Sequence, residues 1–114
     1  MAREKFQTLT EQMFYILLCL QTECYGMDIM EKIKTITNGR VCIGPGTLYH
    51  LLESFMVANL IKETKVEGRK RSYLITDTGV ETLNSEYQRL MVLAKDYCNY
   101  THYIRGVEDE KKET

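Results

Sequence analysis

The apolar positions near the start of the chain follow the three- and four-residue spacing of an α-helix and predict a helix over residues 9–22. One face of this helix carries Leu9, Met13, Ile16, Leu17 and Leu20. The opposite face carries Phe14, Tyr15 and Leu18. A helix that is apolar on both faces needs a second packing partner. Its start is expected at a capping box of Thr8 and Glu11, with Thr10 as the alternative cap.

Two more helices follow. After a turn at TECYG, helical spacing over residues 26–38 predicts a second helix that stops at Asn38-Gly39. Residues 41–43 are expected to form a short strand. Gly-Pro-Gly at 44–46 then opens a third helix, because proline suits the first helical turn. That helix is expected to end near Ala58-Asn59, and its inner face carries Leu48, Leu51, Leu52 and Phe55.

The second half of the chain predicts a hairpin and one long helix. The stretches LIKETKV and RSYLI are rich in β-forming residues, and the intervening EGRK reads as a basic hairpin tip. A helix without proline is expected from an N-cap at Thr76 or Asp77 to about residue 104. Its apolar positions alternate by four and three, with Thr101 as the polar gap, in a coiled-coil seam of Leu83, Tyr87, Leu90, Ala94, Tyr97 and Ile104.

This order of elements is that of a winged helix-turn-helix domain with a C-terminal helix attached, a mainly α fold with a small β-hairpin. We expect residues 1–76 to form the winged helix-turn-helix domain and residues 77–105 to form a long dimerisation helix. The polar tail, residues 106–114, is expected to be disordered.

Length and charge narrow the possibilities further. The chain of 114 residues suits one domain, and no apolar stretch is long enough to span a bilayer. Without a secretory signal pattern, a cytoplasmic protein with no membrane partner is expected. The net charge is only −1, but residues 41–75 carry five Lys or Arg against three Glu. Positive charge is therefore concentrated around the third helix and the hairpin.

The cysteines and histidines suggest no metal or catalytic site. Cys19, Cys24, Cys42 and Cys98 form no CxxC pair, so reduced and mostly buried thiols are expected. Together with His50 and His102 they offer no spacing typical of a metal site, and no cofactor is expected. The sequence contains no recognisable catalytic set, so an enzyme is not expected. Redox sensing through Cys24 or Cys98 stays an alternative.

Several stretches together resemble the PadR family of transcriptional regulators, in particular its short subclass with a single C-terminal helix, over about residues 7–100. They are LTEQMFYILLCL, YGMDIMEKI, GRVCIGPGTLYHLLESF and LIKETKVEGRKRSYLITDTGVETL. The motif GPGTLY, residues 44–49, is the most specific of them. Cys42 and Asn59 are departures from the family pattern. The resemblance implies a regulator whose partner is double-stranded DNA.

The third helix is the candidate recognition helix, because such helices present their N-terminal residues to the major groove. Its inner leucines turn Thr47, Tyr49 and His50 outward, and Gly46 lets the backbone approach another surface. Thr47 and Tyr49 suit phosphate contacts, and the resemblance implies the same positions. The hairpin adds a cationic wing of Lys65, Arg69, Lys70 and Arg71. In the wing, Arg69 and Arg71 are expected on one side and Lys70 on the other.

The seam on the last helix predicts a twofold homodimer, since its apolar residues would otherwise face water. The expected dimer contacts are Phe14, Leu18, Leu83, Tyr87, Leu90, Ala94 and Tyr97. The resemblance implies an aromatic or hydrophobic effector at the dimer interface, with Phe14, Tyr15, Tyr97 and Tyr100 as candidate contacts. The sequence thus favours a dimeric repressor on a palindromic operator. The alternative is a winged helix that binds proteins and has no DNA partner.

Overall fold

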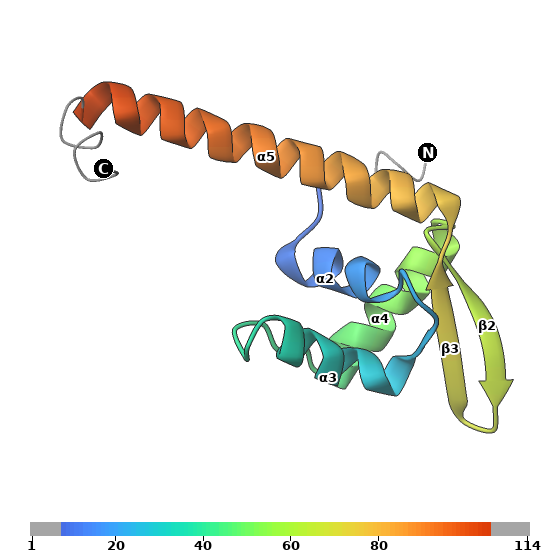
Figure 1. The fold of residues 1–114 in the computed structure, drawn as a ribbon. Coiled ribbons are helices and arrows are strands. Elements are labelled where there is room, and N and C mark those ends of the chain that lie inside the picture. The colour runs from blue at the N-terminus through green and yellow to red at the C-terminus, as the bar shows by residue number, and fades with distance from the viewer. Residues whose placement is uncertain (1–7, 106–114) are drawn as a thin grey trace.

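A computed structural model describes residues 8–105 of the chain, with side chains to residue 101. The predicted tail, residues 106–114, and the side chains of His102 and Ile104 lie outside the described part. The elements in order are α2 (Glu11–Cys19), β1 (Cys24–Tyr25), α3 (Gly26–Ile36), α4 (Pro45–Val57), β2 (Ile61–Glu67), β3 (Lys70–Ile75) and α5 (Asp77–Arg105). This is the expected winged helix-turn-helix arrangement with a long last helix (Figure 1).

The first helix, α2, is shorter than predicted. Thr10 is its N-cap and accepts a hydrogen bond from the Met13 amide at 3.2 Å, so the alternative cap is correct and the box at Thr8 is wrong. Leu9 precedes the helix but is still buried, and the helix ends at Cys19. The apolar periodicity extended past both ends because the flanking residues also pack into the core.

The predicted ends of α3 and α4 are confirmed. Asn38 and Gly39 have φ of 55° and 82°, and the Gly39 amide donates to the Lys34 carbonyl at 2.8 Å. Asn59 has φ of 63°, and the Leu60 amide donates to the Phe55 carbonyl at 2.8 Å. Both ends follow the left-handed stop in which asparagine or glycine closes a helix. The polar Asn59 therefore has a structural role.

The third strand of the sheet is not the one predicted. The sheet has the order β1-β3-β2, with Cys24 opposite Tyr73 and Tyr25 opposite Ser72. The expected strand at residues 41–43 belongs to no sheet. Val41 instead donates its amide to the Thr37 hydroxyl at 3.0 Å, and its side chain and that of Ile43 are buried. The alternation of Val41 and Ile43 therefore belongs to a loop whose side chains enter the core. It does not make a strand, because no strand pairs with these residues.

The wing is a tight antiparallel hairpin of β2 and β3. The two strands pair from Ile61 opposite Ile75 to Glu67 opposite Lys70, with a bulge between Glu63 and Lys65. The turn at residues 68–69 is shorter than the predicted EGRK tip, and Gly68 supplies its positive φ of 61°.

One hydrophobic core joins the helices and the sheet. Its fully buried apolar members come from α2, α3 and α4, from the residues that follow α2 and α4, and from the base of the wing: Ile16, Leu17, Leu20, Ile29, Ile33, Leu48, Leu52, Phe55, Leu60 and Ile61. The Ile75 amide donates to the Leu20 carbonyl and the Thr76 amide to the Leu60 carbonyl, at 2.8 and 2.9 Å. These bonds hold the base of the wing and the start of α5 against the helices, which fixes the wing relative to α4.

The last helix begins in the core and leaves it. Thr76 is the cap, since its hydroxyl accepts from the Gly79 amide at 3.1 Å, and Leu83 is buried. Past α2 the helix continues as a projecting arm (Figure 1). All side chains of residues 90–100 are exposed. Within residues 8–105 no helix is long and apolar enough to cross a membrane.

Candidate nucleic-acid interface

The candidate recognition helix, α4 (Pro45–Val57), has one buried and one exposed face. Gly44 caps it and Pro45 occupies its first turn, as predicted. The expected inner residues Leu48, Leu51, Leu52 and Phe55 are all buried. The exposed face begins at Gly46 and carries Thr47, Tyr49, His50 and Glu53. Thr47, Tyr49 and His50, near the start of the helix, suit contacts with the base edges and phosphates of a duplex. Recognition helices present their N-terminal end to the major groove.

Tyr49 lies against the start of α3. The side chain is 45% exposed, yet its ring covers Gly26 so closely that a Cβ at Gly26 would stand 3.0 Å from the ring carbon Cε1 and 3.2 Å from the hydroxyl oxygen. Gly26 therefore leaves room for the ring. Because the ring is supported on one side, the hydroxyl is held at the surface in a restricted set of rotamers.

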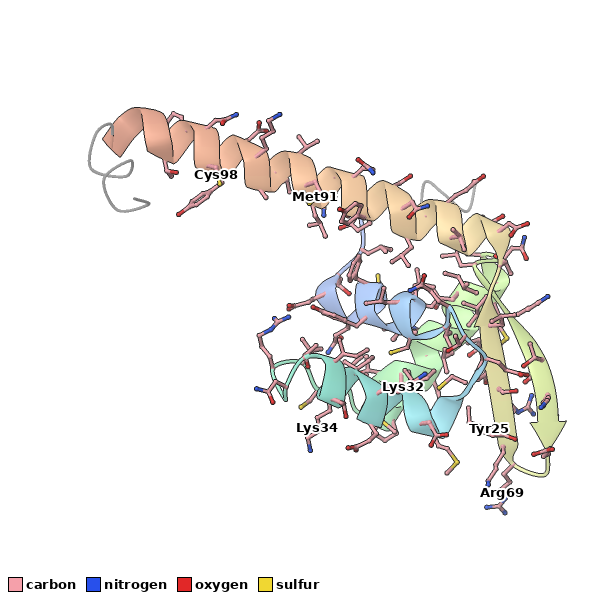
Figure 2. All side chains as sticks on the ribbon, viewed as in Figure 1. Tyr25, Lys32, Lys34, Arg69, Met91 and Cys98 are labelled. Carbon is pink, nitrogen blue, oxygen red and sulfur yellow. The ribbon has the colours of Figure 1, made fainter. Side chains whose placement is uncertain are left out.

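The wing cations do not all have the same surroundings. Arg69 is in the turn, and its side chain points away from the body of the domain (Figure 2). Because Arg69 lies in the turn, strand alternation does not place it on one side with Arg71. Arg71 donates to the Glu63 carboxylate at 2.8 Å, and this ion pair raises the pKa of its guanidinium. Arg69 is therefore more available to an outside anion than Arg71.

Tyr25 ties the wing to the start of α3. Its hydroxyl donates to the Glu67 carboxylate at 2.7 Å, and the Lys70 ammonium lies 5.7 Å from its ring centroid. The hydrogen bond to Glu67 raises the pKa of the Tyr25 hydroxyl. Figure 2 places Tyr25 between α3 and the hairpin. Lys70 is thus partly engaged, and the wing is held beside the helix that supports Tyr49.

The base of the wing is held by a second polar cluster. Ser72 is buried, and its hydroxyl lies 2.8 Å from the Thr64 hydroxyl and donates to the Glu23 carboxylate at 3.3 Å. The Thr64 hydrogen bond is the main cause of the lowered pKa of Glu23, and Lys65 lowers it further. Lys65, a predicted DNA contact, therefore faces a carboxylate of its own chain.

Sequence reasoning missed four residues of this surface. Glu53 carried no distinguishing signal, because a charged residue on an exposed helical face is common. Tyr25 and Glu67 are 42 positions apart, so no local pattern relates them. Gly26 did carry a signal, since a glycine in the first turn of a good helix needs a reason, and the reason is the ring of Tyr49.

The predicted dimer residues divide between the core and the surface. Leu83 is buried in its own chain, and Phe14 and Leu18 are partly buried against the core. Tyr87, Leu90 and Tyr97 are 50%, 40% and 69% exposed, and Ala94 is also exposed. The arm of α5 therefore presents apolar side chains that no described part of the same chain covers.

A groove of about 310 Å³ runs between α2 and the base of α5. Its apolar lining comes from Leu9, Phe14, Tyr15 and Leu90. The rings of Phe14 and Tyr15 meet edge to face, 5.5 Å apart, and Arg40 donates to the Tyr15 hydroxyl at 3.0 Å and to Glu11. Of the four predicted ligand contacts, Tyr97 and Tyr100 do not line this groove, because they lie on the arm.

The groove also contains a buried carboxylate. Glu86 is 2% exposed and accepts two hydrogen bonds from Arg89, one from Nε at 3.1 Å. Arg89 is the largest cause of the lowered pKa of Glu86, and a hydrogen bond from the Leu9 backbone lowers it further. Glu86 therefore attaches the segment before α2 to α5.

Two of the four cysteines are buried and two are exposed. Burial of Cys19 and Cys24 raises the pKa of each thiol, whereas Cys42 and Cys98 are exposed, so the expectation of mostly buried thiols holds for two of the four. Among the described residues no group of three metal-ligating side chains comes together.

Comparisons with known proteins find a family model and solved structures that match this fold. The model of the transcriptional regulator PadR-like family matches residues 16–85, more than half of the chain. Among solved structures, a PadR-like transcriptional regulator from Bacillus cereus has 26% sequence identity and a TM-score of 0.65, with 79% of this chain and 90% of that chain covered. A PadR family regulator from Clostridium difficile has 21% identity, a TM-score of 0.66, and coverage of 78% and 96%.

A third structure, H. salinarum RosR, covers more of the molecule. It has 20% identity and a TM-score of 0.65, and the match spans 95% of this chain and 98% of that chain. The length of the match shows that the long last helix belongs to the shared fold. No curated protein matches the sequence significantly.

Proposed function

Because the chain belongs to the PadR-like family of transcriptional regulators, we propose that it acts as a dimeric, sequence-specific DNA-binding repressor. In this proposal residues 1–76 bind DNA and residues 77–105 dimerise. The observation that carries it is the exposed face of α4, where Thr47, Tyr49 and His50 stand at the leading end of the helix opposite a fully buried apolar face.

The wing extends the proposed DNA contact. Arg69 at the tip is the first candidate for a phosphate or minor-groove contact, since it is exposed and points away from the domain (Figure 2). Lys65, Lys70 and Arg71 would add positive charge, each partly offset by an acidic or aromatic neighbour in its own chain. The hydrogen bond from Tyr25 to Glu67 ties the wing to the start of α3 and supports a defined position of the tip relative to α4.

The proposed dimer explains the arm of α5. An α-helix turns by about 100° per residue, which places exposed Leu93 and Tyr100 on one side of the seam. The same rotation places exposed Met91 and Cys98 on the other side. Apolar side chains therefore cover about half of the helix circumference. One partner helix covers a narrower stripe. The partner subunit's α5 and α2 together would cover both flanks, and the partly buried Phe14 and Leu18 on α2 supply the matching surface.

A twofold dimer would place two copies of α4 in successive major grooves, about 34 Å apart, on a palindromic operator. Repression would follow from occupancy of that operator. An aromatic or hydrophobic effector is proposed for the groove beside Phe14 and Tyr15, with Tyr97 and Tyr100 contributed by the second copy. Release of DNA would follow if the effector shifted one α5 relative to the other.

Equilibrium binding to a duplex from the protein's own upstream region tests the DNA contact. Tyr49→Ala should weaken binding about tenfold for each half-site, because a hydrogen bond to a charged phosphate contributes about 1.5 kcal/mol. Arg69→Ala should lower the slope of log affinity against log salt by about 0.9 for each half-site, the value for one phosphate.

Lys95→Ala, on the arm, is the matched control and should leave both quantities unchanged. Far-ultraviolet circular dichroism would establish that the variants stay folded. Wild-type affinity and salt slope for folded Tyr49→Ala and Arg69→Ala would overturn the assignment of α4 and the wing as the DNA surface.

A further inference from the structure

Glu53 is an acidic side chain at the C-terminal end of the proposed DNA face. It is exposed, and it follows His50 by three residues and Tyr49 by four, which places all three on the same side of α4. Thr47 lies six residues earlier, about 9 Å along the helix axis. These side chains would therefore extend over about three base pairs at 3.4 Å each.

The carboxylate of Glu53 has no partner among the residues that the structure describes. No hydrogen bond or ion pair joins it to another residue within the part of the protein whose side chains are described. The acidic residues of the wing differ in this respect, since Glu63 accepts from Arg71 and Glu67 from Tyr25. On this surface Glu53 keeps its full capacity to accept hydrogen bonds.

The chemistry of the major groove limits what such a group can meet. Phosphates repel a carboxylate, and guanine and thymine present only acceptors or a methyl group there. Adenine presents a donor beside its N7 acceptor, whereas cytosine presents its N4 amino donor without a neighbouring acceptor. A carboxylate buried against DNA without a donor carries a desolvation cost, so most sequences would be penalised at this position.

We propose that Glu53 is a specificity-determining residue that accepts a hydrogen bond from the N4 amino group of a cytosine in each operator half-site. The assignment rests on the proposed function, since it requires α4 to enter the major groove. This role accounts for an acidic residue on a surface that must approach an anionic duplex. The charge lowers the affinity for duplexes with other bases at this position more than it lowers the affinity for the correct operator.

Selection of binding sites from a pool of randomised duplexes tests the assignment, with wild-type protein and Glu53→Gln compared in parallel. Wild-type sites should carry cytosine at one symmetry-related pair of positions, with a preference of about tenfold over other bases. Glu53→Gln should lose that preference or shift it to adenine, which a glutamine amide recognises, and leave the other positions unchanged.

Asp96→Asn removes the same charge from the exposed arm of α5 and should leave the selected sites unchanged. If Glu53→Gln keeps every base preference and binds all duplexes more tightly, Glu53 acts only as a charge near phosphates and the assignment is wrong. If wild-type protein enriches no sequence at all, the proposed function itself fails, which is a separate outcome.

Discussion

Gly26 and Tyr49 illustrate how single residues set the proposed DNA surface. The ring of Tyr49 lies on the backbone of Gly26, so close that an added Cβ would stand 3.0 Å from a ring carbon. The outward direction of Thr47, Tyr49 and His50 was predictable from the spacing of the buried leucines. The support under Tyr49 was not, because it comes from a residue 23 positions earlier whose neighbours only the folded chain defines.

Gly26→Ala should weaken DNA binding by displacing the Tyr49 ring, since a methyl group would stand 3.0 Å from Cε1. We expect a loss of about fivefold, because the ring can move a few tenths of an ångström. Equilibrium binding in a double-mutant cycle checks the mechanism. The effect of Gly26→Ala should disappear in a Tyr49→Ala background. An equal loss in both backgrounds would show that Gly26 acts without Tyr49.

The elements differ in how far local pattern determines them. Helices α3 and α4 stop just before Asn38-Gly39 and Asn59, and these ends were predictable because the stop signals are local. Strand β1 exists only through pairing with β3, and residues 41–43 lack such a partner, so alternation alone predicted the wrong strand. The docking of α5 depends on Gly79, where a Cβ would stand 2.1 Å from the Leu60 carbonyl oxygen.

Gly79→Ala should destabilise the protein by about 2 kcal/mol, because the clash with the Leu60 backbone exceeds the gain in helix propensity of about 1 kcal/mol. Urea unfolding at one fixed protein concentration measures this. Gly46→Ala is the matched control, also in the first turn of a helix, since its Cβ would meet nothing within 4 Å. Equal stabilities of the two variants would contradict the close approach of α5 and the wing.

The link between α5 and the segment before α2 should depend on pH through Glu86. Arg89 lowers the pKa of this buried carboxyl, so its stabilisation is present above the ordinary carboxyl pKa and is lost as pH falls through the lowered folded-state pKa. Glu86→Gln should cost about 2 kcal/mol at pH 7, and the difference from wild type should shrink below about pH 4.

Urea unfolding at pH 7 and pH 3, again at fixed protein concentration, checks the role of Glu86. Asp96→Asn, on the exposed arm, should change the free energy of unfolding by less than about 0.5 kcal/mol at both values. A Glu86→Gln deficit that is the same at both pH values would mean that the charge of Glu86 contributes nothing.

At the scale of the whole molecule, the arm of α5 is the feature that one chain leaves unexplained. The alternation of fours and threes in its sequence predicted a seam, and the structure leaves Tyr87, Leu90 and Tyr97 exposed on it. Leu83 belongs to the same seam but is buried in the core of its own chain. Sequence periodicity could not show this difference, because the spacing of a seam is the same whether it packs on its own chain or on another. Pairing through the arm would set the distance between two copies of α4.

The sites that wild-type protein selects from randomised duplexes test the central claim most directly, since they report both the contact and the symmetry. Two copies of α4 in successive major grooves predict an inverted repeat whose half-site centres lie about 10 base pairs apart. A single unrepeated site, or no enriched sequence, would contradict a dimer that reads DNA through α4.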